Sequence, residues 1–448
     1  MTTASASTPS AVPHASESTR FKKLKLGGFV AVLYAYCAAG PFGFEEMIST
    51  SGPGMSLIFL LAAPWLFSLP MSLATSEMAT AMPVEGGFYR WTRAAFGDFW
   101  GFQCGWWNWT GTFLMNGAYA VVLADYTSQL FPSLNGGWRH WLTALFFLAV
   151  VAWVNIRGIQ VVGGVTVALL LTVLVPVAVF TLLGFVKMQV NPFVPLTPPG
   201  KPWREVYGVG LALALWLYSG YEQLSTITEE VENPPRNFPL GLAIMVPLAM
   251  VTFFLPIAAG IGAGADWQKW TTGYLVTVAR GVGGEPLAWA MFSAAMIAVL
   301  LGLQSTLLSS TRLPFTMSED GYFHASFAKL DERYRTPVQA IVLTSAICAG
   351  LAVFSLPKLI ATYMWLRVAT SVLTLLSVWR LRRTRPEMPR GFRIPGGEVG
   401  VAAVVIVPSL LFAWLLINSD TSALIWGPAS LALGPVAAVF LLKKKASA

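Results

Sequence analysis

Charged residues are scarce in this chain. Asp, Glu, Lys and Arg together make up 11% of its 448 residues, against roughly 25% in a soluble domain. Hydrophobic residues make up 55%, and the mean hydropathy is +0.63. So few charges cannot cover a soluble protein of this length. The composition excludes that class and predicts a polytopic membrane protein embedded in a lipid bilayer.

Cysteine and histidine are also rare. Each occurs only three times, the cysteines lie inside long apolar stretches, and neither residue type shows metal-ligand spacing. No nucleophile and base stand at a catalytic spacing either. The sequence therefore supports neither a disulfide framework, nor a metal site, nor a cofactor, nor an enzyme. The residues concerned are Cys37, Cys104, Cys348, His14, His140 and His324.

Long apolar stretches, by contrast, dominate the chain. Those of about 20 residues, enough to cross a bilayer, lie near 26–48, 55–82, 98–130, 139–156, 158–187, 206–227, 239–263, 286–312, 338–355, 357–381, 399–417 and 422–442. We therefore expect an all-α membrane protein with twelve transmembrane helices. Residues 1–20 are predicted to be a disordered N-terminus without a signal peptide, residues 21–398 a core of ten helices, and residues 399–448 the last two helices and a C-terminal tail.

Lysine and arginine are unevenly distributed among the segments that join these stretches. If the N-terminus is cytoplasmic, most of them fall on the cytoplasmic side, including Arg380, Arg382, Arg383 and the run Lys443–Lys445. This bias predicts that both termini face the cytoplasm. We also expect the protein to lie in the cell membrane. The formal charge of +8 is thus a signal of orientation, and nucleic acid is not expected as a partner.

Two of the apolar stretches are interrupted near their middle. The first interruption reads A-A-G-P-F-G-F-E-E over Ala38–Glu46, and the second reads Y-S-G-Y-E-Q-L-S over Tyr218–Ser225. Backbone polar groups without partners cost roughly several kcal/mol each in hydrocarbon, so a broken helix persists there only around a cavity or a ligand. The paired breaks therefore predict a central transport site.

Four stretches in a fixed order carry a family resemblance. They are G-P-F-G at Gly40–Gly43, M-P-V-E-G-G-F-Y-R-W at Met82–Trp91, E-E-V-E-N-P-P-R-N-F-P at Glu229–Pro239, and M-S-E-D-G-Y-F at Met317–Phe323 with R-T-P at Arg335–Pro337. Together they resemble the amino acid–polyamine–organocation transporter superfamily. The resemblance implies the LeuT-type fold, a five-plus-five inverted repeat with helices one and six broken. It also implies proton-coupled uptake or exchange of amino acids or amines.

Within that superfamily, the motifs are most similar to the polyamine-uptake and amino acid permease branch. The similarity lies in G-P-F-G-F-E-E at Gly40–Glu46 and A-F-G-D-F-W-G-F-Q at Ala95–Gln103. The chain departs from the polyamine pattern in two ways. Cys104 and Thr374 stand where that branch carries acidic side chains, and Arg367, in the middle of the tenth stretch, would repel a polycation. These departures favour an amino acid over a polyamine as the substrate.

The resemblance places the substrate at the first break, where backbone N–H groups of the broken helix hold its carboxylate. Pro41 has no N–H, so this loop offers one donor fewer than a glycine-rich loop. Arg367 either replaces the missing contact or neutralises Glu46 or Glu222. The candidate substrate-binding residues are Ala38, Ala39, Gly40, Pro41, Phe42, Gly43, Glu46, Trp216, Tyr218, Gly220, Tyr221, Glu222 and Arg367.

Glu222, in the second break, is the candidate coupling group. An ionisable side chain at membrane depth costs on the order of 2.5–3.5 kcal/mol and usually faces a partner or a water-filled path. Alternate burial and hydration would let its carboxyl group bind and release a proton. A structural pairing with Arg367 is the alternative. Trp216, Tyr218 or Tyr221 could cover the substrate, because an aromatic face attracts an ammonium group.

Three functions follow from these observations. The first is a secondary active amino acid transporter, coupled to protons and working by alternating access, and the second is a polyamine carrier of the same fold. The third is a sensor that keeps the fold without transporting. Sodium coupling, through backbone carbonyls and the hydroxyls of Ser305, Thr306 or Ser309, is an alternative to the proton.

Overall fold

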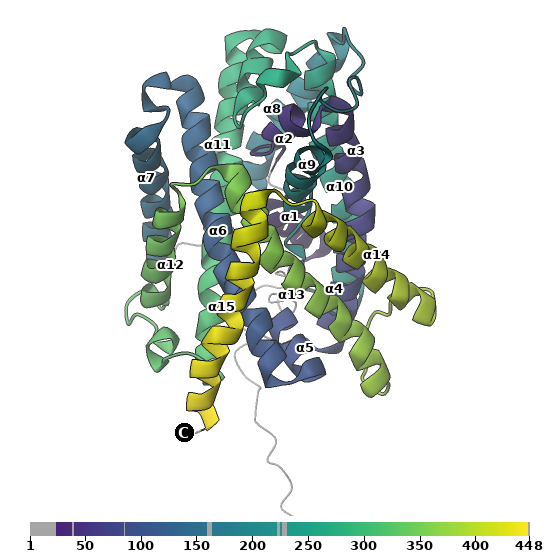
Figure 1. Ribbon diagram of the computed structural model, residues 1–448, viewed down its shortest axis with the longest axis vertical. Coiled ribbons are helices and arrows are strands. Elements are labelled where there is room, and N and C mark those ends of the chain that lie inside the picture. Colours follow the sequence, from purple (N-terminus) through teal and green to yellow (C-terminus); the bar gives the residue numbers. More distant parts are fainter. Residues whose placement is uncertain are drawn as a thin grey trace, which may run out of the picture.

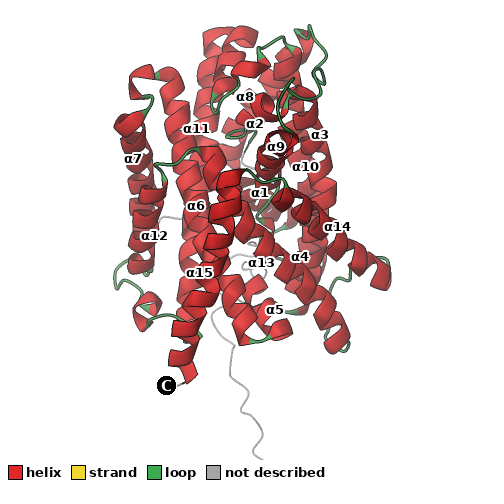
Figure 2. Ribbon diagram, in the orientation of Figure 1, coloured by secondary structure: helices red, strands yellow, loops and turns green. Residues whose placement is uncertain are grey.

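The computed structural model describes residues 24–37, 40–84, 86–158, 164–221, 225 and 231–446. The named secondary-structure elements of these residues are all helices (Figures 1 and 2). The helices are α1 Leu26–Cys37, α2 Glu46–Ser51, α3 Pro53–Ala63, α4 Leu69–Ala81, α5 Gly87–Phe96, α6 Asp98–Leu130, α7 Gly137–Ile156, α8 Gly164–Val186, α9 Trp203–Leu217, α10 Pro234–Gly262, α11 Tyr274–Glu319, α12 Val338–Leu351, α13 Leu356–Thr384, α14 Gly397–Ile417 and α15 Thr421–Ala446. A π-helical turn, η1 at Pro64–Ser68, joins α3 to α4.

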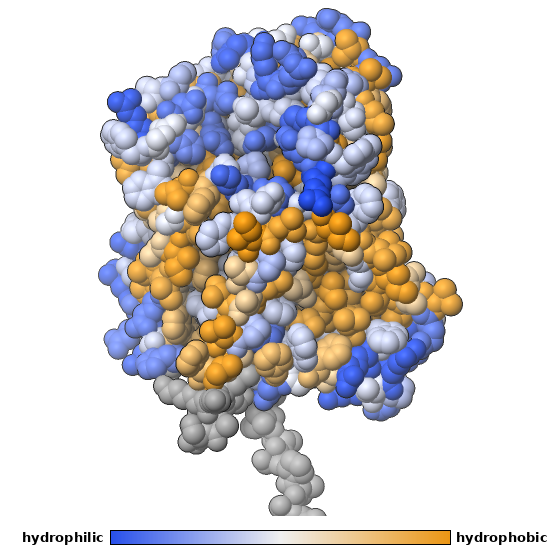
Figure 3. All heavy atoms as spheres, viewed as in Figure 1, coloured by the Kyte–Doolittle hydropathy of each residue, from blue (hydrophilic) through white to orange (hydrophobic). Residues whose placement is uncertain are grey.

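Eight helices of the described part are long and apolar enough to cross a membrane. They are Pro53–Ala81, Gly137–Ile156, Ala168–Val186, Pro234–Gly262, Tyr274–Glu319, Leu356–Thr384, Gly397–Ile417 and Thr421–Leu441. Figure 3 shows apolar side chains gathered in a band across the molecule, with hydrophilic side chains above and below it. The protein is therefore an all-α, multi-pass membrane protein, and the total of twelve spans, the inverted repeat and the three predicted chain segments stay predictions.

The long helix α6 lies at the centre of the packing. It contacts α11 and α13 most extensively, and it also packs against α5, α7, α12 and α15 (Figure 1). Its glycines allow close approach: the backbone at Gly117 lies beside Leu351 of α12, and Gly111 lies beside Tyr363 of α13. A central site is therefore expected among the side chains that α6 presents to α11 and α13.

The helix α11 is bent near one end. Gly284, with φ 77° and ψ −171°, is not helical, and Pro286 lies near the start of the long part that follows. Glycine adopts this positive φ without strain. Proline fits the first turn of a helix because the backbone N–H that it lacks has no intrahelical acceptor there. The span predicted over 286–312 thus begins at the bend, whereas the helical residues 274–283 before it were missed.

Two of the motifs that carry the family resemblance meet in space. Tyr89 of α5 belongs to the stretch Met82–Trp91, which Arg93 follows in the same helix, and Asp320, at the end of α11, belongs to the stretch Met317–Phe323. The Tyr89 hydroxyl donates a 2.8 Å hydrogen bond to Asp320 Oδ2, and Arg93 Nη1 lies 3.4 Å from the same oxygen. Burial, with Asp320 adding to the effect, raises the pKa of Tyr89, so its hydroxyl stays a donor. The contact fixes α5 against α11.

Candidate functional site

The first predicted break is present between α1 and α2. The helix α1 ends at Cys37, and α2 begins at Glu46. Gly40 (φ 139°) and Gly43 (φ 92°) adopt backbone angles that other residues rarely take. The Phe42 N–H donates a 2.9 Å bond to the Gly40 carbonyl, which turns the chain sharply. The glycines noted in the sequence are what allow this backbone to leave the helix.

The second break begins where α9 ends, at Leu217. The Ser219 N–H and hydroxyl both donate to the Trp216 carbonyl, at 3.1 and 2.8 Å, and Gly220 follows with φ 110°. Carbonyl groups at a helix end have no intrahelical donor, so these two bonds satisfy a group that the break leaves open. Tyr221 is buried directly after the turn.

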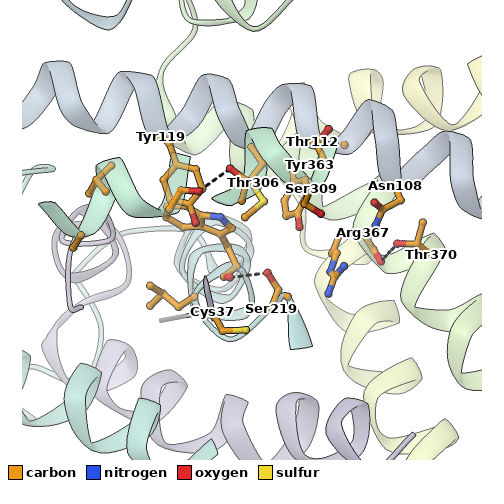
Figure 4. Close-up of a pocket in the computed structure, with 18 of the residues that line it drawn as sticks. Cys37, Asn108, Thr112, Tyr119, Ser219, Thr306, Ser309, Tyr363, Arg367 and Thr370 are labelled. Atoms are coloured by element: carbon orange, nitrogen blue, oxygen red, sulfur yellow. Dashed lines mark hydrogen bonds between the residues drawn. The ribbon is translucent and has the colours of Figure 1, made fainter. Parts of the chain in front are cut away.

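A cavity lies between the two breaks and the helices α6, α11 and α13 (Figure 4). Its volume, counted as room for the centres of water molecules, is about 60 Å³. That is room for roughly four to six waters, so the cavity is small. The lining residues are Cys37, Gly40, Phe42, Trp107, Asn108, Gly111, Thr112, Met115, Tyr119, Trp216, Leu217, Ser219, Gly220, Ala298, Val299, Gly302, Thr306, Ser309, Tyr363, Arg367 and Thr370.

The cavity has an aromatic end and a polar end. At the first, the ring of Trp216 packs against that of Tyr119, with 5.6 Å between their centroids. At the second, Arg367 and Thr370 reach in from α13 beside Asn108 of α6 (Figure 4). Arg367 is only 3% exposed. Its guanidinium stays charged and presents several N–H donors, which suits a carboxylate.

The family is decided by the match to its sequence model, which runs over residues 11–440 under the description amino acid permease. The chain belongs to the amino acid permease family. This membership confirms the predicted resemblance to the amino acid–polyamine–organocation superfamily, and it makes the protein a membrane transporter and not an enzyme.

The relatives of this permease are named for different substrates. It is 29% identical to polyamine transporter RMV1 of Arabidopsis thaliana, over 93% of this chain and 85% of the relative. It is also 29% identical to polyamine transporter PUT1 of Oryza sativa subsp. japonica, over 91% of this chain and 76% of the relative. It is 24% identical to the branched-chain amino acid permease BcaP of Bacillus subtilis, over 90% and 89%.

The structure of the permease brings part of the predicted substrate site together. Five of the candidates line the cavity, namely Gly40, Phe42, Trp216, Gly220 and Arg367. Five others lie elsewhere: Pro41, Gly43, Tyr218 and Tyr221 are buried outside the cavity lining, and Glu46 is half-buried at the start of α2. Ala38, Ala39 and Glu222 lie outside the described residues. Substrate contact stays a prediction for each of these residues.

One wall of the cavity was missed by reasoning from the sequence. Asn108, Thr112 and Tyr119 come from α6, and Tyr363 and Thr370 come from α13. Asn108 and Thr112 are four residues apart and therefore lie on one face of their helix. Two polar residues at that spacing in an apolar helix were the available signal. Which face of α6 meets a cavity is decided by its packing against α11 and α13.

One of the proposed sodium ligands, Thr306, is engaged with protein groups. The Thr306 hydroxyl is 2.8 Å from the Gly302 carbonyl of its own helix and 2.5 Å from Asn116 Oδ1 of α6. A threonine hydroxyl has one proton to donate, and here it has three acceptors within reach, the third being the Leu303 carbonyl at 3.2 Å. The contact with Asn116 ties α11 to α6 at the edge of the cavity.

Glu45 occupies the end of the first break, next to α2. Its side chain is fully buried, its Oε2 accepts a 3.0 Å hydrogen bond from the Gly43 N–H, and its Oε1 accepts one from the Tyr126 hydroxyl of α6. The ring of Tyr126 packs edge-on against that of Phe42, which lines the cavity. A buried carboxyl group is thus connected to the cavity wall through one aromatic contact.

Proposed function

We propose that this permease carries amino acids across the cell membrane by exposing the central cavity alternately to the two sides, and that transport is coupled to protons. The observation that carries the proposal is Arg367, a buried cation in a small cavity between two helix breaks. A central cavity of this kind is what such a carrier needs, because the substrate site must be reached from one side of the membrane at a time.

The Arg367 guanidinium suits a substrate carboxylate. Hydrogen bonds to charged groups contribute about 1.5–3 kcal/mol, and a guanidinium can make two parallel bonds to one carboxylate. The first break contributes its small backbone at Gly40, and Trp216 and Tyr119 provide aromatic surface for the rest of the substrate. A zwitterion with a short side chain would match both ends of this cavity.

A polyamine fits these residues less well. Two positive charges about 6 Å apart repel by about 3 kcal/mol at an effective dielectric constant of about 20. A polycation beside Arg367 would therefore need carboxylates around it, and none of the described residues that line the cavity is acidic. The amino acid reading also agrees with the name of the relative BcaP.

The polyamine alternative rests on the two relatives named polyamine transporters. It requires an acidic group from the second break, and Glu222 is the candidate in the sequence. The same residue is our proposed coupling group, with sodium as the alternative to the proton. Both roles assume that the Glu222 side chain reaches the cavity.

Uptake by the purified protein in liposomes tests these proposals. We expect a radiolabelled mixture of the standard amino acids to accumulate under an imposed pH gradient, and unlabelled neutral, cationic and acidic amino acids, putrescine and spermidine to compete to different degrees. Competition by putrescine and spermidine alone would establish the polyamine alternative. Binding without accumulation would establish the sensor, and accumulation driven only by a sodium gradient would contradict proton coupling.

A substitution at Arg367 tests the site itself. Arg367→Ala removes a charge-assisted contact worth about 1.5–3 kcal/mol, which corresponds to amino acid binding that is roughly 10- to 150-fold weaker. Arg367→Lys should recover part of the affinity, because it keeps the charge without the planar pair of donors. Arg280→Ala is the matched control, since Arg280 pairs with Glu285 on the exposed surface. Unchanged affinity in folded Arg367→Ala would refute the carboxylate role.

The proposed orientation has its own test. A protease-cleavable tag at each terminus should be protected in intact cells and cleaved after the membrane is permeabilised, since both termini are expected in the cytoplasm. Cleavage of either tag in intact cells would contradict this arrangement.

A further inference from the structure

Glu45 is a buried carboxyl group outside the proposed substrate site. It does not line the cavity, its side chain has no exposed area, and both of its oxygens are engaged. Burying a charged carboxylate is costly unless it is paired or becomes neutral by taking up a proton. The identity of its partners therefore decides what Glu45 does.

The partners of Glu45 are neutral. None of the ion pairs within the part of the chain that the structure describes includes it. Its contacts are the Tyr126 hydroxyl and backbone N–H groups, including that of Gly43, while Asp125 and Lys201 nearby pair with other groups. Asp125 of α6 pairs with His140 of α7 at 2.7 Å, and Lys201 lies 3.5 Å from the Ser49 carbonyl. Glu46 is next to Glu45 in the chain, at the start of α2.

These partners can serve the carboxyl group in both of its forms. A tyrosine hydroxyl donates to an ionised carboxylate and can turn to accept from a protonated one. The Gly43 N–H donates to Oε2 in the structure, and it can donate equally to the carbonyl oxygen of the neutral acid. An arginine in place of Tyr126 would have no acceptor to offer and would favour the ionised form alone. The Glu45–Tyr126 pair is thus suited to reversible protonation of the carboxyl group.

Glu45 is also linked to the cavity. The Gly43 N–H that it accepts from belongs to the first break, and an added Cβ at Gly43 would lie 3.6 Å from the Trp216 ring. The other partner, Tyr126, packs against Phe42 with 5.9 Å between ring centroids. Both Trp216 and Phe42 line the cavity. A change in the charge of Glu45 therefore acts on the backbone and rings that enclose the substrate.

We propose that Glu45 takes up and releases a proton in each transport cycle, with Tyr126 as its reversible hydrogen-bond partner. When the break opens to water on the proton-rich side, a hydronium ion gives its proton to a Glu45 oxygen and leaves water. The new O–H then donates to the Tyr126 oxygen while the site is closed. Opening to the other side hydrates the group, the proton passes to water, and Tyr126 again donates. The proposal rests on the proton-coupled transport proposed above.

Two transport assays on the full-length protein in liposomes separate coupling from translocation. One pH unit can drive at most about tenfold accumulation for each proton carried. We expect Glu45→Gln, a neutral mimic of the protonated acid, to lose this accumulation and reach only equal concentrations on both sides. It should keep counterflow, the exchange of the labelled amino acid mixture for unlabelled amino acids without a gradient. Glu398→Gln is the matched control and should keep both activities, because Glu398 is an exposed carboxylate that pairs with Arg383 outside the site.

The outcomes are distinct. If the wild-type protein shows no accumulation under a pH gradient, the proposed function fails. If the wild-type protein accumulates substrate and Glu45→Gln accumulates it equally, the inference about Glu45 fails. Loss of both accumulation and counterflow in folded Glu45→Gln would also overturn it, because Glu45 would then be structural. The same assays on Glu222→Gln distinguish the two glutamates.

A second variant covers the case in which Glu45→Gln does not fold. Tyr126→Phe keeps the carboxyl group and the aromatic ring, but it removes the hydroxyl that serves both forms of the acid. We expect the pH at which uptake is half-maximal to shift, while counterflow at the pH of maximal uptake is retained. An unchanged pH profile would overturn the inference.

Discussion

Two glutamates of this permease are equally buried and have opposite surroundings. Glu45, at the first helix break, has a tyrosine hydroxyl and a backbone N–H as partners. Glu77, at the end of α4, is held by two arginines: Arg382 of α13 lies 2.6 Å from Oε1 and 2.5 Å from Oε2, and Arg390 lies 3.2 Å from Oε1. The Ile394 N–H donates to Oε2 as well, at 2.8 Å.

The difference shows how the same side chain serves two purposes. Two guanidinium groups pair with the Glu77 carboxylate, so it acts as a fixed charge that ties α4 to α13 and to the segment after it. Neutral partners leave Glu45 free to exist with or without its proton. Burial alone therefore does not identify a coupling residue, whereas burial together with neutral, reversible partners does.

The largest expected effect comes from neutralising the fixed charge. Glu77→Gln leaves the buried guanidinium groups of Arg382 and Arg390 without their counter-charge, and breaking a buried pair in this way costs about 3–5 kcal/mol. Glu45→Gln should change the free energy of unfolding by less than about 1 kcal/mol, because the amide resembles the protonated acid and keeps its hydrogen bonds. Unfolding of the purified variants in mixed detergent micelles, by titration with denaturing detergent, measures both values.

The control for this pair is an exposed carboxylate. Asp266→Asn removes the partner of Lys269, whose side chain is 71% exposed, and it should change the stability by less than about 0.5 kcal/mol. Equal destabilisation by Glu77→Gln and Glu45→Gln would show that Glu45 is a fixed charge too. A Glu77→Gln variant as stable as the Asp266→Asn control would mean that the two arginines contribute nothing measurable.

An intermediate effect is expected at Gly43, because the Glu45 site depends on the backbone of the break. Gly43→Ala places a Cβ at a φ of 92°, where an L-residue is strained by about 1–2 kcal/mol. The added atom itself would fit, at 3.4 Å from Val122 and 3.6 Å from Trp216. The loss of stability should therefore reflect backbone strain, and unfolding in mixed micelles again measures it.

Gly27→Ala is the matched control for this strain. Gly27 lies in α1, no atom comes within 4 Å of its added Cβ, and its φ is ordinary. Alanine is favoured over glycine inside a helix by roughly 0.8–1 kcal/mol, so this variant should be no less stable than the wild type. If both variants behave alike, the break does not depend on the glycine at residue 43.

Local features of the fold could be predicted from the sequence, and features made by packing could not. Gly40 and Gly220 mark the two breaks because the need for a positive φ is a property of the residue itself. Glu45 and Glu46 are adjacent, so they cannot both face one side of a helix, and the choice of Glu45 depends on Tyr126, 81 residues away. Arg367 was found as an isolated charge in an apolar helix, whereas Asn108 needed the packing of α6.

The smallest expected effect concerns Tyr218, which was predicted from the sequence to contact the substrate. Its hydroxyl donates a 2.8 Å bond to the Leu60 carbonyl, and its ring packs edge-on against Phe253. The residue four positions after Leu60 is Pro64, which has no N–H, so the hydroxyl supplies a donor that α3 lacks. Tyr218→Phe should therefore cost about 0.5–1.5 kcal/mol of stability and leave amino acid affinity unchanged. Weaker binding at unchanged stability would instead place Tyr218 with Arg367 among the substrate contacts.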